Sequence, residues 1–237
     1  SASSGGEGGA TVPGSGDVAV FDDNSGDCVL NDDVEVGGLH LTAGFQGRVS
    51  QGSAVLAIGD GRFDVAGGEF SGGSENITID MGATTGGAPL ALLGGVFTSS
   101  SGRLSILRSS TESEVMVHFS GGTFNHNSGE LYIFCNPDVK NNVDMLLQID
   151  AEVRLYDLQL AGGNTRSGYW RYYQTLLGEA GRLVVENNLT IMPGAIGLLG
   201  LHSGAIEVHG NVTVNERMMG GDTEIVFCGG GDQYYAA

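Results

Sequence analysis

The chain has 237 residues, including 42 glycines and 4 prolines, and its formal net charge at pH 7 is −18. Nucleic-acid binding needs a basic surface, and 10 lysines and arginines against 28 acidic residues do not supply one. The same charge disfavours anionic membranes, and no apolar run is long enough to span a bilayer.

Residues 1–10 are rich in serine and glycine, a composition typical of a flexible tail. The small residues Ser1 to Ser4 would suit a mature end from which a leader was removed. We expect this tail to add a strand to a neighbouring subunit, and the alternative is that it folds back on its own first coil.

An acidic turn follows the first short strand pattern. Asp22, Asp23 and Asp27 lie close together in sequence, with Asp32 and Asp33 nearby. Carboxylate oxygens are suitable Ca²⁺ ligands, so these residues are a candidate calcium site. The spacing differs from that of an EF-hand loop, and the alternative is a solvated turn of an acidic protein.

The stretch from Gly67 to Ile133 contains one pattern three times, and the copies begin at 67, 94 and 121, a period of 27 residues. Each copy has a Gly-Gly pair, a phenylalanine two residues later, and an alternating apolar pair. The phenylalanines are Phe70, Phe97 and Phe124, and the second aliphatic residues are Ile79, Ile106 and Ile133. A fixed period in this range indicates stacked coils, in which these side chains form columns.

We therefore predict an all-β fold, a single parallel β-helix (β-solenoid) with coils of about 23–27 residues, over residues 11–228. The alternative is an antiparallel sandwich. After Ile133 we expect the period to break into shorter units. The last two of these align position for position, with Asn188 and Asn211 at equivalent corners, which indicates αL geometry or an amide ladder. Residues 229–237 are predicted to form a C-terminal tail.

An aromatic segment at 164–178 does not match the coil pattern, and we predict that it leaves the solenoid at a corner. It contains Tyr169, Trp170, Tyr172 and Tyr173. Exposed aromatic residues beside arginine are typical of interfaces, and they also stack on sugars. The other interpretation is a lid over the solenoid's own side. We predict interface roles for these residues and for Tyr234 and Tyr235.

The remaining sequence motifs do not indicate a catalytic or metal-binding site. Cys28, Cys135 and Cys228 allow either one disulfide and one thiol or three thiols, and their spacing does not indicate a metal site. The five histidines form no close pair in sequence. Glycosylation sequons begin at Asn76, Asn188 and Asn211, where repeat corners meet strands, so the repeat itself explains them. No nucleophile elbow or phosphate-binding loop is present.

Three segments resemble a known group of sequences. They are Thr-Val-Pro-Gly-x-Gly-Asp-x-Ala-Val-Phe-Asp at 11–22, Val-Gly-Gly-Leu-x-Leu at 36–41, and Gly-Gly-x-Phe-x-x-x-Ser-Gly-x-Leu-x-Ile at 94–106. Together they resemble the glycine-rich β-solenoid repeats of very large secreted or surface proteins of bacteria, over about residues 11–214. The resemblance implies a parallel β-helix and an extracellular location, and it implies no catalytic residues.

The functional prediction is a structural, self-assembling subunit of an extracellular surface fibre, with other copies of the chain as its partners. The alternative is a carbohydrate-binding or carbohydrate-cleaving β-helix, similar to an adhesin, with glycans as partners. We expect no enzymatic activity, no membrane insertion, and no cofactor apart from the calcium candidate.

Overall fold

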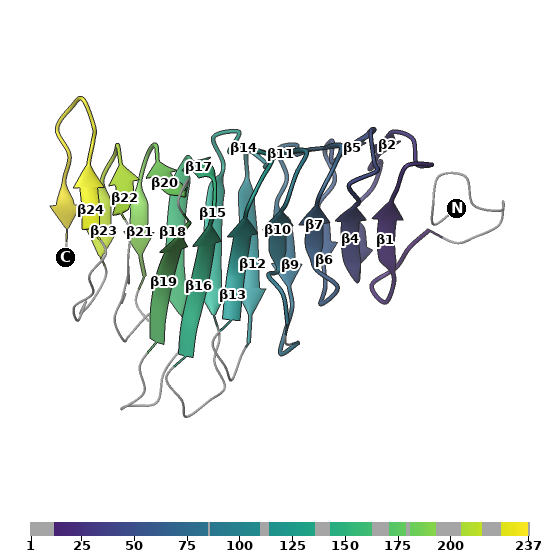
Figure 1. Ribbon diagram of the computed structural model, residues 1–237, viewed down its shortest axis with the longest axis horizontal. Coiled ribbons are helices and arrows are strands. Elements are labelled where there is room, and N and C mark those ends of the chain that lie inside the picture. The colour runs from purple at the N-terminus through teal and green to yellow at the C-terminus, as the bar shows by residue number, and fades with distance from the viewer. Residues whose placement is uncertain are drawn as a thin grey trace.

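The computed structural model describes residues 12–84, 86–109, 114–135, 143–162, 171–178, 181–192, 205–214 and 224–236, and the side chains of 143, 144 and 171–177 are not among them. The molecule is elongated, and its strands run across the long axis (Figure 1). The described residues contain strands and turns but no helix, and therefore no helix that could cross a membrane.

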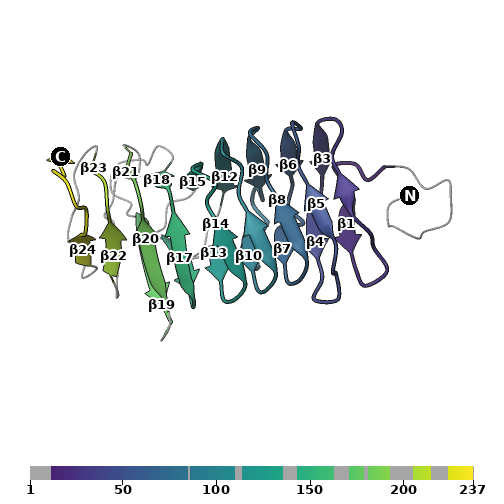
Figure 2. The ribbon, with the colours of Figure 1, turned by 90° about the horizontal axis from the view of Figure 1, so that it is seen from above.

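The strands form four parallel sheets, here named A to D, each of which extends along the long axis of the molecule (Figure 2). Sheet A contains β1 (Val18–Phe21), β4 (Gly38–Leu41), β7 (Phe63–Val65), β10 (Leu90–Leu92), β13 (Glu114–Phe119), β16 (Val143–Ile149) and β19 (Arg171–Leu177). Sheet B contains β2 (Cys28–Val29), β5 (Arg48–Ser50), β8 (Glu69–Ser71), β11 (Val96–Thr98) and β14 (Thr123–Asn125).

Sheet C contains β3 (Val34–Val36), β6 (Leu56–Ile58), β9 (Ile77–Asp80), β12 (Arg103–Arg108), β15 (Glu130–Cys135), β18 (Asp157–Gly162), β21 (Leu189–Ile191), β23 (Val212–Val214) and β25 (Tyr235–Ala236). Sheet D contains β17 (Glu152–Leu155), β20 (Arg182–Val185), β22 (Ala205–Val208) and β24 (Glu224–Phe227).

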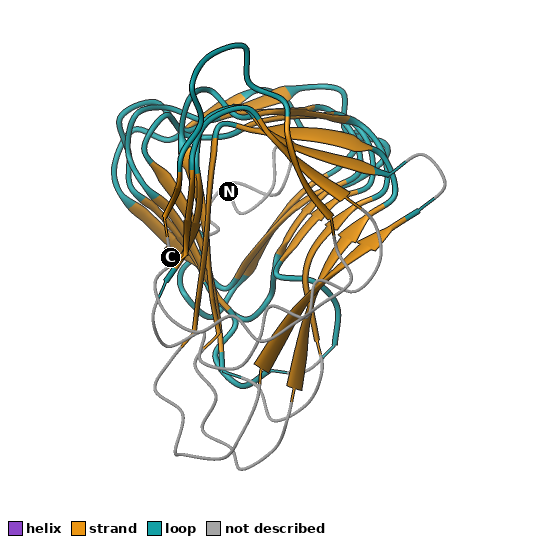
Figure 3. Ribbon diagram, turned by 90° about the vertical axis from the view of Figure 1, so that its left-hand side faces the viewer, coloured by secondary structure: helices purple, strands orange, loops and turns teal. Residues whose placement is uncertain are grey.

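Successive strands enter different sheets, so the chain winds around a central core. The first fifteen strands repeat the order A, B, C, and sheet D then takes the place of sheet B in the chain order. Figure 3 looks along the axis and shows strands on the sides of a common interior. The all-β parallel solenoid predicted from the sequence is confirmed, and the antiparallel sandwich is wrong because these pairings are parallel.

The core consists of columns of inward-facing side chains. Phe97 pairs in register with Phe70 and Phe124, and its ring stacks on theirs at centroid distances of 5.2 and 5.5 Å. Ile106 lies between Ile79 and Ile133 in the same way, and all three are buried. Both predicted columns are therefore confirmed.

Coil length varies more than the sequence repeat predicted. Leu104 pairs with Ile77 and Leu131 at the interval of that repeat, and Leu131 pairs with Leu158 at the same interval. The period therefore continues one coil beyond the expected break. The interval then lengthens from Leu158 to Leu189 and shortens from Leu189 to Val212, because corner loops change length while the strands stay aligned.

The Gly-Gly pairs make tight corners between sheets A and B. The second glycine of each pair, Gly68, Gly95 and Gly122, has a φ between 59° and 72°, a region that favours glycine. A Cβ added at Gly95 would lie 2.5 Å from the Gly68 carbonyl oxygen. Adjacent coils thus approach too closely at this corner for any larger residue.

A second corner is held by side chains that bond to the backbone of the next coil. Asn188 Oδ1 accepts a hydrogen bond from the Asn211 amide at 3.1 Å, and Asn211 Oδ1 accepts one from the Tyr234 amide at 3.0 Å. Asp157 and Asn76 make the equivalent bonds to Asn188 and Arg103. The predicted asparagine ladder is thus present as a side-chain-to-backbone ladder, and it accounts for the three sequons.

Part of the predicted aromatic excursion is wrong. Residues 171–177 form β19, which pairs along its whole length with β16 in sheet A, so this half belongs to a coil. The backbone hydrogen bonds of a seven-residue strand outweigh its imperfect apolar alternation. The predicted C-terminal tail also returns to the solenoid, because β25 pairs with β23. Residues 1–10 lie outside the described residues.

Candidate functional site

The first coil leaves its inward side chains partly uncovered. Phe21, Cys28 and Val34 are only half-buried, although each pairs in register with a buried residue of the second coil. Those partners, Leu41, Val49 and Leu56, are no more than 1% exposed. The difference arises because no described element lies in front of the first coil. The result is an apolar cavity of about 300 Å³, which we call the N-terminal mouth.

The last coil shows the same arrangement at the other end. Phe227 pairs with the fully buried Val208 but is 45% exposed, and Tyr235 pairs with the fully buried Val212 but is 58% exposed. Their register places both on the inward-facing columns, so it is the lack of a following coil among the described residues that exposes them. We call Ile225, Phe227 and Tyr235 the C-terminal rim.

The outer surface of sheet D carries a chain of ion pairs. The Arg182 guanidinium donates to both carboxylate oxygens of Glu207, each at 2.6 Å, and to Glu152 at 3.1 Å. Arg154 links Glu152 to Glu186. The hydrogen bonds from Arg182 hold the pKa of the Glu152 and Glu207 carboxyls below the usual range, so both are ionised at neutral pH.

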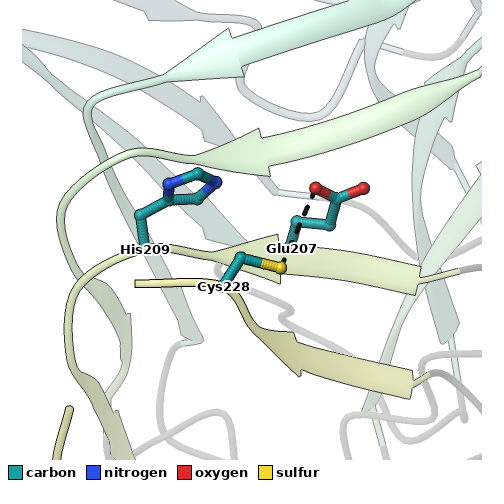
Figure 4. Close-up of side chains that lie close together, drawn as sticks. All are labelled: Glu207, His209 and Cys228. Atoms are coloured by element: carbon teal, nitrogen blue, oxygen red, sulfur yellow. Dashed lines mark hydrogen bonds between the residues drawn. The ribbon is translucent and has the colours of Figure 1, made fainter. Parts of the chain in front are cut away.

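The chain of ion pairs ends beside a mixed group of side chains. Glu207 lies on β22, His209 directly follows that strand, and Cys228 directly follows β24. The ligand atoms of these three residues lie within 4.8 Å of one another, and theirs is the one such group in the part of the chain that the structure describes. Figure 4 shows the Cys228 sulfur directed toward the Glu207 carboxylate, with the two atoms Sγ and Oε2 4.0 Å apart.

The carboxylates of the predicted calcium site accept hydrogen bonds from neighbouring groups. Asp22 accepts hydrogen bonds from the Asn24 amide and the Ser25 hydroxyl, each at 3.0 Å, which closes a turn. Asp27 Oδ1 accepts a hydrogen bond from the Arg48 amide at 2.8 Å, as the ladder residues do at the other corner. Asp23 accepts a hydrogen bond from the Asn24 side chain. Backbone and neighbouring groups thus already engage these carboxylates, and calcium binding here stays a prediction.

The predicted aromatic interface residues are placed in part. Tyr234 and Tyr235 are 67% and 58% exposed at the end of sheet C. Tyr172 and Tyr173 lie on β19, although their side chains are not described. Tyr169 and Trp170 lie outside the described residues. The structure therefore places Tyr234 and Tyr235 on the surface at the end of the solenoid, and the interface role of all six residues stays a prediction.

Sequence reasoning missed the group formed by Glu207, His209 and Cys228. No disulfide joins Cys28, Cys135 and Cys228, which leaves the exposed Cys228 thiol available for other chemistry. A usable signal existed, because Ile206-x-Val208 and Ile225-x-Phe227 are recognisable strands. Alignment of the two strands places Cys228 beside His209, each directly after its strand.

A buried arginine is explained by the fold. Arg108 is 1% exposed, and its guanidinium donates to the carbonyl oxygens of Gly87, Val115 and Thr84 and pairs with Glu114 at 3.0 Å. A buried charge requires such partners. Arg108 therefore fastens the loop between β9 and β10 to β13, and it presents no charge to a ligand.

Comparison of the chain with protein families, with curated proteins and with solved structures finds no match to any of them.

Proposed function

We propose that the chain is a structural subunit that assembles end to end into an extracellular fibre. The main observation behind this proposal is that the inward-facing apolar side chains of the first and last described coils are exposed, at the N-terminal mouth and the C-terminal rim. Solenoid coils bury their apolar faces only by stacking, so an uncovered end is the natural place for another copy.

The two ends are suited to each other. The N-terminal mouth is concave and lined mainly by apolar side chains, and the C-terminal rim offers Ile225, Phe227 and Tyr235. The edge strands β1, β2 and β3 at one end and β24 and β25 at the other have one neighbour each in their sheets. The edges of these strands that no described strand occupies can pair in parallel with another copy, as strands do within the chain. Contact between unlike ends continues without closing, which produces a fibre rather than a ring.

The extracellular location is supported by the resemblance of the glycine-rich repeats to secreted and surface solenoids. The Gly/Ser-rich residues 1–10 are a further candidate connector. Deleting residues 1–9 tests whether this tail connects subunits. If the tail is the connector, the deletion should abolish assembly. If assembly and stability do not change, the contact between subunits is made only by the N-terminal mouth and the C-terminal rim.

Sedimentation velocity of end variants tests the assembly. Phe227→Ser should shift the protein from large elongated species toward monomer, because it removes an apolar side chain of the C-terminal rim. Leu93→Ser is the matched control, since Leu93 is 47% exposed and lies in the corner after β10, along the side of the solenoid. Circular dichroism of both variants checks that each remains folded. Equal assembly by the two variants would contradict the proposal.

A second candidate function is binding or cleavage of carbohydrate. A cleft of about 600 Å³ beside β3, β6 and β9 is lined by Glu35, Asp60 and Asp80 and by hydroxyl groups of Thr78 and Thr84. Such groups bind sugar hydroxyls, but the lining contains no aromatic ring for stacking on a sugar. A glycan array and a reducing-sugar assay test this candidate, and Asp60→Asn should weaken any binding that occurs in the cleft.

A further inference from the structure

We propose that Glu207, His209 and Cys228 form a binding site for a transition-metal ion of the Zn²⁺ type. The site follows from the register of sheet D. Val208 pairs with Phe227, so His209 and Cys228 occupy equivalent positions on consecutive coils. The Cys228 amide donates to the Val208 carbonyl oxygen at 2.9 Å, which fixes this alignment.

The strand alternation places Glu207 and His209 on the same face. Ile206 and Val208 are fully buried, whereas Glu207 is half-buried and His209 is exposed, so the latter two point away from the core. Cys228 is exposed beside them. A carboxylate, an imidazole and a thiol from two strands therefore converge at one point on the surface (Figure 4).

The donor types select the metal. Thiolate and imidazole ligands favour Zn²⁺ and similar transition metals, whereas Ca²⁺ and Mg²⁺ favour oxygen ligands alone. Zn²⁺ holds its ligands at about 2.0–2.3 Å, which places them about 3.5 Å apart in a tetrahedron. The present separations are within 4.8 Å, and small rotations of the exposed His209 and Cys228 side chains close the difference. Three protein ligands leave one coordination position for water.

Arg182 prepares the site without blocking it. Its two donors occupy one lone pair on each Glu207 oxygen, and each oxygen retains another for a metal ion. The same hydrogen bonds fix the orientation of the carboxylate. Arg182 also pairs with Glu152, which Arg154 links to Glu186. The three carboxylates and one thiolate therefore outnumber the two guanidinium groups, and this negative balance favours a divalent cation.

Binding couples to loss of one proton. The Cys228 Sγ–H bond breaks, the proton passes to solvent, and the sulfur electron pair forms the bond to the metal. No oxidation or reduction takes place, so no further reagent is required.

Cobalt titration of the reduced full-length protein tests the site, with Co²⁺ as a spectroscopic substitute for Zn²⁺. The wild type should bind one equivalent and show sulfur-to-cobalt charge-transfer absorption. That absorption should be lost in Cys228→Ser, and His209→Ala should bind at least about tenfold more weakly. His118→Ala is the matched control, because His118 lies on sheet A, paired with Asp150, and it should resemble the wild type.

Thermal unfolding provides a second readout. Zn²⁺ should raise the unfolding midpoint of the wild type and His118→Ala, because a ligand that binds the folded state stabilises it. It should not raise that of Cys228→Ser. Absence of the charge-transfer band in the wild type, its persistence in Cys228→Ser, or effective competition by Ca²⁺ would overturn the proposal.

Discussion

Replacement of Phe97 by alanine tests the packing of the solenoid core most sharply. The Phe97 side chain is fully buried, and its ring contacts those of Phe70, Phe124 and Phe63 at centroid distances of 5.2, 5.5 and 5.3 Å. Truncation of a buried phenylalanine costs about 3–5 kcal/mol in total. Because each aromatic pair contributes about 0.5–1.5 kcal/mol beyond area burial, the three ring contacts place Phe97 in the upper part of that range. We therefore expect the free energy of unfolding to fall by about 4–5 kcal/mol.

Urea unfolding followed by circular dichroism measures this loss, provided that the denaturant slope is unchanged. Phe134→Ala is the matched control, because Phe134 lies on the outer face of β15 and is half-buried beside Tyr132. It should cost about 1 kcal/mol, in the range of partly exposed sites. A loss below about 1 kcal/mol for Phe97→Ala would refute the stacked column.

Three further predictions concern corners and charges. Gly95→Ala should destabilise the fold by more than the roughly 1–2 kcal/mol cost of a left-handed backbone, because the added Cβ would meet the Gly68 carbonyl oxygen. Gly82→Ala is the control, since Gly82 also has a positive φ but has open space around it, so it should cost only the backbone strain. Thermal unfolding of the two variants compares these costs. Asn188→Ala should cost about 1 kcal/mol through the lost bond to the Asn211 amide, whereas Asn188→Asp, which keeps the acceptor, should cost less in urea unfolding. The pKa values of Glu152 and Glu207 are lowered in the folded state, so the stabilisation by Arg182 is present above the ordinary glutamate pKa of about 4.3 and is lost as pH falls through the folded values. The unfolding midpoint should therefore fall on acidification, and Arg182→Gln should make this fall shallower; equal slopes would contradict the pairing.

The regular part of the fold was predictable because register follows directly from equal spacing. A constant interval places Phe70, Phe97 and Phe124 at the same point of successive coils, and the Gly-Gly corner recurs with them. The corner asparagines were predictable for the same reason, since Asn188 and Asn211 precede aligned strands.

Prediction failed where the coils change length or the alternation is weak. β16 and β19 are paired strands, but the second reads Arg-Tyr-Tyr-Gln-Thr-Leu-Leu, which lacks a clear inward-facing set. The group of Glu207, His209 and Cys228 forms because Ile206 pairs with Ile225. The sequence interval of this pair is shorter than the interval between Val212 and Tyr235, which pair in sheet C at the same end of the solenoid. Without a constant period, sequence separation alone does not reveal which side chains meet, and the signal lies instead in the alignment of the two strand patterns that precede His209 and Cys228.

Electron cryomicroscopy of the assembled protein under native ionic conditions tests end-to-end assembly most directly. We predict fibres in which the N-terminal mouth of each subunit contacts the C-terminal rim of the next, so that sheet C of one subunit continues into sheet C of the next along one polar axis. Particles that remain monomeric, or that join through their sides or through like ends, would contradict this arrangement.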